Sequence, residues 1–171
     1  MNTDLRQYVR HSKGFVDSKL CDTLVHEMRT AEFREHEFYN PRTKTKGPQS
    51  GSQELSVCWS NLSSKPILSD RLWYAIRDYL QYIDMPWYDG WSGYTPPRFN
   101  KYDEDKKMAL HCDHIHNMFD GERKGIPVLS VLGVLNDDYE GGEFIMFNDT
   151  EIKFDKGDVL VFPSVFLYPH K

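Results

Sequence analysis

The sequence predicts an α+β fold of a single domain, residues 1–171, in which N-terminal helices pack on one side of a β core. Two observations favour this fold class. Apolar residues recur at helical spacing in two stretches before residue 86, whereas short apolar runs separated by turn residues fill the chain after it. A chain of this length can build one hydrophobic core without disulfides. The second half is therefore expected to form a sandwich or barrel.

The helical support is predicted over residues 1–85. Asp17 and Ser18 provide N-cap side chains for a first helix, and Ser69 and Asp70 provide them for a second. The apolar positions of the two helices are Leu20, Leu24, Val25 and Met28, then Leu72, Ile76, Tyr79, Leu80 and Ile83. Strands are expected at residues 8–15, 32–39 and 55–60.

Residues 40–54 interrupt this half with a stretch that has no periodicity and is rich in Gly, Pro and Ser. An irregular stretch of this length inside a compact domain is typical of a functional lid or of a disordered segment. We interpret it as a lid loop. Its basic residues Arg42, Lys44 and Lys46 are expected to be solvated surface.

The β core is predicted over residues 86–171. Its expected strands are residues 98–102, 108–116, 127–136, 143–147, 151–154 and 158–162. Residues 127–136 form the most continuous apolar run, which is typical of a strand buried on both faces. Gly141, Gly142 and Gly157 are expected to lie in turns.

Charge and cysteine content exclude several classes of protein. The chain has 21 Lys and Arg against 26 Asp and Glu, a net charge of −5, so neither nucleic acid nor an anionic membrane is expected as a partner. No apolar run approaches the roughly 18 residues of a membrane span, and the polar N-terminus is unlike a signal peptide. Cys21, Cys58 and Cys112 lack CxxC spacing and cannot all pair, which favours a reducing, cytoplasmic location.

A metal site is predicted around His111 and Asp113. Residues two apart in a strand project to the same side, so this imidazole and carboxylate can share an ion, and His170 offers a third ligand. Two histidines and one carboxylate form the facial triad that binds non-haem Fe(II). Zinc binding through His114 and His116 is an alternative, whereas a cupin-type set has a poorly placed glutamate, Glu122.

The order of motifs carries a family resemblance. His111 and Asp113 are followed by the apolar run at 129–136, by Gly141-Gly142 within residues 139–144, by the turn at 156–158, and by His170. In this order, residues 98–171 resemble the prolyl 4-hydroxylase-like branch of the Fe(II)/2-oxoglutarate-dependent dioxygenases. The resemblance implies that the β core is a double-stranded β-helix, a jelly-roll variant, with helices bracing one sheet.

The resemblance also implies the roles of individual residues. His111, Asp113 and His170 would bind Fe(II), and 2-oxoglutarate and O2 would take the three remaining positions, with ascorbate as a possible reductant. Decarboxylation of 2-oxoglutarate to succinate would accompany hydroxylation of a C–H bond. Tyr102, nine residues before His111, would hydrogen-bond 2-oxoglutarate, and Ser130 would lie near it. Simple core packing is the alternative for both.

One departure from the family concerns the partner of the far carboxylate of 2-oxoglutarate. Relatives carry a Lys or Arg on the strand beyond the distal histidine, but here Lys171 follows His170 directly and ends the chain. We expect that a C-terminal tail is missing; otherwise the cosubstrate is bound differently. Arg98, Lys101 and Lys153 are weak candidates for a substitute.

A prolyl residue in a peptide or protein is the substrate that the resemblance implies. Aromatic residues that could line a groove for a proline ring, or simply pack in the core, are Trp87, Tyr88, Trp91 and Tyr94. The alternatives are a free amino acid or small molecule as substrate, and a non-catalytic metal-binding module with impaired 2-oxoglutarate binding. The charge disfavours nucleic-acid demethylation. The sequence does not indicate an oligomeric state.

Overall fold

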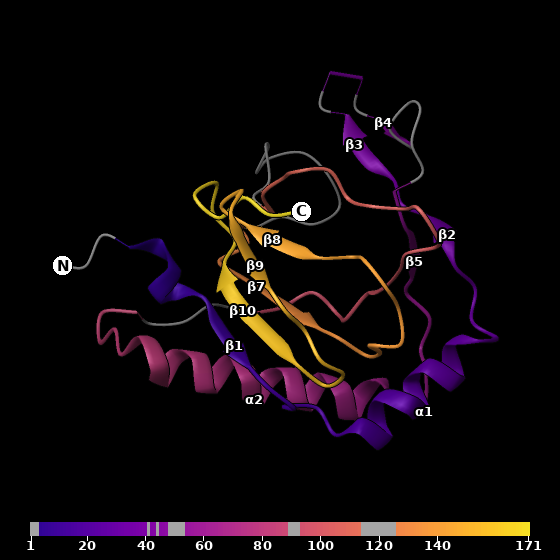
Figure 1. The fold of residues 1–171 in the computed structure, drawn as a ribbon, viewed down its shortest axis with the longest axis horizontal. Helices are drawn as coiled ribbons and strands as arrows, with labels where there is room; N and C mark the ends of the chain where they lie inside the picture. Colours follow the sequence, from indigo (N-terminus) through magenta and orange to yellow (C-terminus); the bar gives the residue numbers. More distant parts are fainter. Residues whose placement is uncertain (1–3, 41, 44, 48–53, 89–92, 114–125) are drawn as a thin grey trace.

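The computed structural model describes residues 4–40, 42–43, 45–47, 54–88, 93–113 and 126–171 (Figure 1). Within these residues, two α-helices lie along one side of a set of small antiparallel sheets. Both of these helices lie before residue 86, where the sequence places the helical support, but strands lie on both sides of that residue. No helix of the described residues combines the length and the apolar character that a membrane crossing requires.

The first helix, α1 (Ser18–Met28), begins where the sequence predicts. The Asp17 carboxylate accepts hydrogen bonds from the backbone N–H groups of Lys19 at 2.9 Å and Leu20 at 3.3 Å. These bonds satisfy N–H groups that the first helical turn leaves without partners. Because the cap is local in sequence, the start of α1 could be predicted.

The second helix, α2 (Lys65–Ile83), begins earlier than predicted. Ser69 lies inside it and donates its hydroxyl hydrogen to the carbonyl of Lys65 at 3.0 Å. Proline in the first turn favours the earlier start, and the N–H of Ser64 is bonded by Glu27 of α1 at 3.2 Å. The prediction from Ser69 and Asp70 was wrong because the cap comes from another helix.

A three-stranded antiparallel sheet lies on α2 in the order β1 (Arg10–Ser12), β10 (Val159–Pro163), β7 (Leu129–Gly133) (Figure 1). Val159 and Val161 belong to the core that includes the helices, whereas Leu160 and Phe162 belong to a second core with Met146 and Tyr168. The central strand, β10, is therefore the one buried on both faces. Residues 127–136 were expected to fill that place, but β7 pairs with one strand only among the described residues and is half-buried.

A second layer covers the other face of β10. It contains the hairpin of β8 (Phe144–Met146) and β9 (Thr150–Ile152), and the last residues of the chain lie alongside β8. Lys171 and Ile145 exchange two backbone hydrogen bonds of 2.9 and 3.0 Å. On its other side, this terminal segment pairs with His111 through an isolated antiparallel bridge from His170. The end of the chain thus lies between β8 and residue 111.

The turn before β10 anchors this strand to the N-terminal segment. Gly157 has φ +91°, and a Cβ there would lie 2.3 Å from the carbonyl oxygen of Val16, so glycine is required. Asp158, 1% exposed, accepts hydrogen bonds from the N–H of Gly14 at 2.8 Å and contacts His11 Nε2 at 2.8 Å. The predicted turn at Gly157 is therefore also a contact between distant segments.

The remaining strands form a second three-stranded sheet and a hairpin. The sheet has the order β2 (Arg34–Glu35), β5 (Ser56–Cys58), β6 (Phe99–Lys101), and the hairpin pairs β3 (Phe38–Asn40) with β4 (Thr45–Gly47). The strand predicted at 32–39 is split after Glu35, where the chain leaves the pairing with β5. The stretch 40–54 was expected to be irregular but contains β4, because pairing with β3 supplies hydrogen bonds that local sequence does not reveal.

Two predicted strands are much shorter in the structure. Residues 8–15 contain only β1, preceded by a 3-10 helix, η1 (Leu5–Tyr8), which Asp4 caps. Residues 108–116 were expected to form a strand around the metal site, but the described part holds only the bridge at His111, and residues 114–116 lie outside the described residues. The other predicted strands are present, shortened at one or both ends.

Candidate metal centre

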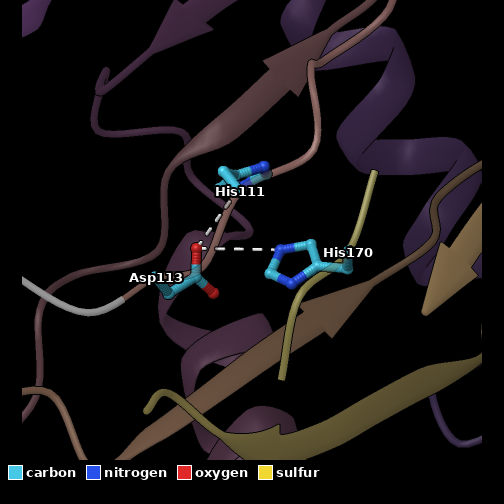
Figure 2. A group of neighbouring side chains, drawn as sticks. All are labelled: His111, Asp113 and His170. Carbon is cyan, nitrogen blue, oxygen red and sulfur yellow. Dashed lines mark ion pairs between the residues drawn. The ribbon is translucent and has the colours of Figure 1, made fainter. Parts of the chain in front are cut away.

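His111, Asp113 and His170 converge on one point (Figure 2). Oδ1 of Asp113 lies 3.6 Å from Nε2 of His111 and 3.8 Å from Nε2 of His170, and the candidate ligand atoms all lie within 4.8 Å of one another. The structure therefore brings together the three residues that the sequence predicts as a triad. Two imidazoles and a carboxylate at these distances can hold one divalent metal ion.

The backbone explains how residues 59 positions apart meet. His111 N–H donates to the carbonyl of His170 at 3.0 Å, and His170 N–H donates to the carbonyl of His111 at 2.9 Å. This exchange makes the two histidines a directly opposed antiparallel pair, whose side chains lie on the same side. Their ring centroids are 4.4 Å apart. Asp113 joins them from the same side, whereas Cys112 turns away and donates to the carbonyl of Phe166 at 3.3 Å.

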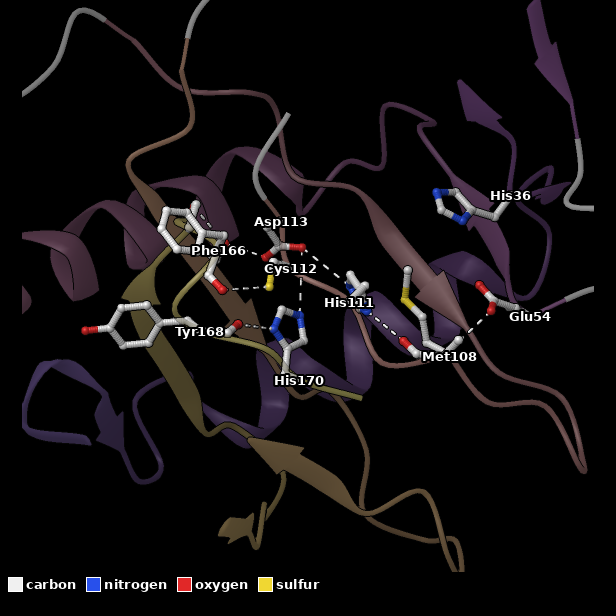
Figure 3. Close-up of polar contacts among 12 residues, drawn as sticks. His36, Glu54, Met108, His111, Cys112, Asp113, Phe166, Tyr168 and His170 are labelled. Atoms are coloured by element: carbon white, nitrogen blue, oxygen red, sulfur yellow. Dashed lines mark hydrogen bonds and ion pairs between the residues drawn. The ribbon is translucent and has the colours of Figure 1, made fainter. Parts of the chain in front are cut away.

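Each histidine uses its Nδ1 in the same local hydrogen bond. Nδ1 of His111 lies 2.9 Å from the carbonyl oxygen of Ala109, and Nδ1 of His170 lies 3.1 Å from that of Tyr168 (Figure 3). A carbonyl oxygen only accepts, so Nδ1 carries the hydrogen in both rings. In the neutral imidazole this leaves the lone pair on Nε2, the atom that faces Asp113. Both rings thus present their metal-binding nitrogen to the same point.

The electrostatics of the site keep Asp113 ionised. Burial alone raises its pKa, but the interactions with His111, Ser130 and His170 outweigh burial and lower the pKa of Asp113 to about 2. The two histidines differ. The Asp113 carboxylate raises the pKa of His111, whereas burial lowers the pKa of His170, which is 6% exposed.

His170 lies in an aromatic environment. Its ring stacks on Phe144 with 5.3 Å between centroids and meets the edge of Phe162 at 5.1 Å. His111 has no comparable aromatic packing beyond His170 among the described ring contacts, and its side chain is 28% exposed. Core residues therefore cover the His170 side of the site, whereas the His111 side chain is partly exposed.

Ser130 supports Asp113 from β7. Its hydroxyl donates to Oδ2 of Asp113 at 2.5 Å, and its oxygen lies 2.8 Å from the hydroxyl of Ser164, which is 1% exposed. Sequence reasoning singled out Ser130 as a neighbour of the cosubstrate but missed Ser164. Only the pairing of β7 with β10 brings Ser164 to this place, so no local signal could have found it.

Glu54 is a second residue that sequence reasoning missed. It is 8% exposed, and its Oε1 accepts the backbone N–H of Ala109 at 3.1 Å (Figure 3). The carbonyl of the same residue, in the next peptide group, bonds His111, so Glu54 and His111 hold Ala109 from its two sides. A glutamate at the end of an apparently irregular stretch gives no signal of such a role.

Tyr102 lies just beyond β6, near the site but not among the triad contacts. Its hydroxyl points to the sulfur of Met108 at 3.8 Å, and the residue is 48% exposed. Burial of the phenol end raises the pKa of Tyr102, and the carboxylates of Glu54 and Asp113 raise it further. A direct role in binding 2-oxoglutarate stays a prediction.

The other residues weighed from the sequence lie apart from the triad or outside the described residues. Lys101 pairs with Asp103 at 2.8 Å, and Arg98 lies over the ring of Trp59. Tyr94 packs against Trp73 of α2, 6.1 Å between centroids, and Trp87 is 73% exposed. His114, His116, Glu122 and Trp91 fall outside the described residues, as do residues 41, 44 and 48–53 of the predicted lid.

Part of the chain is similar in sequence to known hydroxylases. The chain is 35% identical over 80 residues to a PKHD-type hydroxylase of Stenotrophomonas maltophilia, covering 44% of this chain and 36% of the relative. A PKHD-type hydroxylase of Acinetobacter baumannii is 36% identical over 80 residues, covering 43% and 35%. The matches thus span little more than a third of the length of these curated relatives. No protein-family model matches the chain.

A solved structure resembles the whole fold. The crystal structure of a Pseudomonas putida prolyl-4-hydroxylase superposes with a TM-score of 0.55 at 18% sequence identity, covering 95% of this chain and 83% of that one. The fold of the chain is therefore similar to that of this prolyl-4-hydroxylase. The resemblance carried by the sequence motifs is confirmed by these relatives and by the similar fold, and the chain has the predicted triad residues at one point of its structure.

Proposed function

We propose that the chain is an Fe(II)- and 2-oxoglutarate-dependent hydroxylase in which His111, Asp113 and His170 bind the metal. The observation that carries the proposal is the convergence of two Nε2 atoms and Oδ1 of Asp113, with both Nδ1 atoms engaged by carbonyls. This donor set fits Fe(II), since two histidines and one carboxylate on one side leave positions open for other ligands. When bound, iron and 2-oxoglutarate would supply the oxidising chemistry that protein side chains lack.

The residues around the triad would then exclude water from the metal ligands and orient the cosubstrate. Phe144 and Phe162 shield His170 from solvent, which favours the neutral, metal-binding imidazole. Tyr102 is our proposed hydrogen-bond donor to the cosubstrate, because it offers a hydroxyl nine residues before His111, where the resemblance implies this role. The side chains of Leu160 and Phe162 pack between the β1-β10-β7 sheet and the layer that contains β8 and β9. We further propose that these two layers are the two sheets of a double-stranded β-helix within one oxygenase domain.

The substrate that we propose is a prolyl residue in a peptide or protein. We propose a reducing, cytoplasmic location for the enzyme. Two exposed apolar residues lie in the segments that carry the triad, Leu110, 49% exposed, and Phe166, 68% exposed. Leu110 precedes His111, and the carbonyl of Phe166 is bonded by Cys112. Such a surface suits an apolar ring more than a charged or nucleotide substrate. A free amino acid or small molecule is the second candidate substrate, since the His111 side chain is partly exposed.

Turnover with defined peptides tests the proposal. Purified protein would be incubated with Fe(II), 2-oxoglutarate, ascorbate and proline-rich peptides, and succinate and peptide mass would both be measured. We expect succinate release that depends on Fe(II), together with a peptide mass gain of one oxygen. The matched control is His111→Ala, which removes one proposed ligand.

The two readouts separate the alternatives. Succinate release with no peptide mass gain would contradict the prolyl substrate but not the oxygenase. Metal binding without any succinate release would favour a non-catalytic metal-binding module. Absence of metal binding by the wild-type protein would overturn the whole proposal.

A further inference from the structure

The two oxygens of the Asp113 carboxylate have different surroundings. Oδ1 faces the two histidines, 3.6 and 3.8 Å from their Nε2 atoms. Oδ2 points the other way and accepts the hydroxyl hydrogen of Ser130 at 2.5 Å. One oxygen is therefore directed at the proposed metal position, and the other is held by the protein.

The chemistry of the groups fixes the direction of the hydrogen bonds behind Asp113. A carboxylate can only accept, and a serine hydroxyl has one hydrogen to donate. Because Ser130 gives that hydrogen to Asp113, the 2.8 Å contact between the hydroxyls of Ser130 and Ser164 must be donated by Ser164. The result is a directed chain from Ser164 through Ser130 to Oδ2 of Asp113.

The pairing of β7 with β10 positions the two serines of this hydrogen-bond chain. Ser130 lies opposite Phe162 in the pairing of β7 with β10, and Ser164 N–H continues the ladder by donating to the carbonyl of Val128 at 3.0 Å. Ser164 comes two positions after Phe162, so their side chains share the face on which Ser130 lies. Asp113 itself follows the isolated bridge at His111 and belongs to no strand. Its orientation thus depends on a hydrogen bond from a sheet it does not join.

We propose that Ser164 and Ser130 are positioning residues that hold Asp113 so that only Oδ1 is presented to the metal. This inference rests on the proposed function, because it takes the triad to bind a metal ion. It also assigns Ser130 a different role from direct binding of 2-oxoglutarate. Since its only hydrogen is donated to Asp113, Ser130 has none to offer to a carboxylate of the cosubstrate.

Removal of the Ser130 hydroxyl should change how Asp113 binds metal. Without its partner, Oδ2 is free to turn toward the ion, so a one-oxygen ligand can become a two-oxygen ligand. Loss of a hydrogen bond to a metal ligand typically weakens metal binding by about 10- to 100-fold. A change in the number of ligand atoms is visible directly in the metal, independently of turnover.

Co(II) in place of Fe(II), without 2-oxoglutarate, provides that measurement. The visible absorption of bound Co(II) and its dissociation constant would be recorded for the wild type, Ser130→Ala, Ser164→Ala and Ser130→Thr. Ser12→Ala in β1, on the same sheet, is the matched control. We expect an altered Co(II) spectrum and about 10- to 100-fold weaker binding for Ser130→Ala, a smaller change in the same direction for Ser164→Ala, and recovery in Ser130→Thr.

Each outcome has a separate meaning. An unchanged Co(II) spectrum and affinity in Ser130→Ala would overturn the inference. Weaker 2-oxoglutarate binding by the same variant, measured in a separate titration, would then support direct binding of the cosubstrate by Ser130. Failure of the wild type to bind Co(II) would overturn the proposed function as well. If circular dichroism shows that Ser130→Ala does not fold, the inference is tested with Ser164→Ala. A Co(II) spectrum and affinity equal to those of the wild type in that variant would overturn the inference.

Discussion

His170 and His111 would bind the same ion, yet the protein supports them in different ways. His170 is 6% exposed, packs between Phe144 and Phe162, and forms bridges to residues on both sides, His111 and Met146. His111 is more exposed and lies in a segment that the described contacts hold by the bridge to His170 and by Glu54 through Ala109. The distal histidine is thus part of the hydrophobic core, and the proximal one is held by hydrogen bonds.

This difference indicates how stability and metal binding are divided. Removal of core packing around His170 should affect the fold and the metal together, because the same aromatic contacts serve both. Changes around His111 should affect the metal mainly, because few buried apolar contacts are lost. The site can therefore be weakened from one side without loss of the fold.

The largest contrast is expected between His111→Ala and His170→Ala. Both should abolish Co(II) or Fe(II) binding, since each removes a ligand. Only His170→Ala should also destabilise the metal-free protein by about 2 kcal/mol or more, because it leaves a cavity between two aromatic rings. His111→Ala should change the free energy of unfolding by less than about 1 kcal/mol. Urea denaturation of the metal-free variants and calorimetric metal titration check both statements; equal destabilisation would contradict the contrast.

Phe162→Ala should test the aromatic packing around His170 without replacing a proposed metal ligand. Phe162 is 2% exposed and contacts both His170 and Phe144, so the change should cost about 3–5 kcal/mol of unfolding free energy. Phe166→Ala, an exposed aromatic in the same part of the chain, is the matched control and should cost less than about 1 kcal/mol. Denaturant unfolding of the metal-free proteins gives both values. A similar loss in the two variants would argue against a packed wall behind His170.

Glu54→Leu should weaken metal binding through its effect on the segment that carries His111. Leucine leaves the N–H of Ala109 without its acceptor, at a cost of about 1–3 kcal/mol. We expect about 10-fold weaker metal binding, because Ala109, whose carbonyl bonds His111, is held less firmly. Glu54→Gln is the control, because the amide oxygen can still accept from Ala109. Metal titration with a fold check by circular dichroism measures the effect. Equal losses in the two variants would show that the charge of Glu54, and not its hydrogen bond, is what matters.

The smallest effect is a difference in titration between the two histidines of the metal-free protein. Asp113 raises the pKa of His111 and burial lowers that of His170, so the rings should titrate on opposite sides of the ordinary value of about 6.5. A raised pKa means that the contribution of His111 to stability is present in full below about pH 6.5 and is lost as the pH rises through its folded pKa. His170 acts in the opposite direction, costing stability as the pH falls below about 6.5. NMR titration of the two rings, assigned with the alanine variants, checks the order.

Sequence reasoning found the features whose signals are local. Asp17 caps α1 with its own side chain two and three residues away, and His111 and Asp113 keep their shared side although the expected strand around them is only a bridge. His170 could be predicted as a third ligand because residue type and motif order carry the resemblance. The start of α2 could not be predicted, since Glu27 of another helix bonds Ser64.

The chain by itself determined which three side chains can bind a metal, because ligand chemistry resides in residue type. Only the tertiary structure decided which atoms of those side chains face one another and what holds them there. Ser164 reaches Asp113 through the register of two strands, and Glu54 reaches Ala109 across 55 residues. Such contacts depend on where separate elements pack, and the residues that make them have no common pattern along the chain.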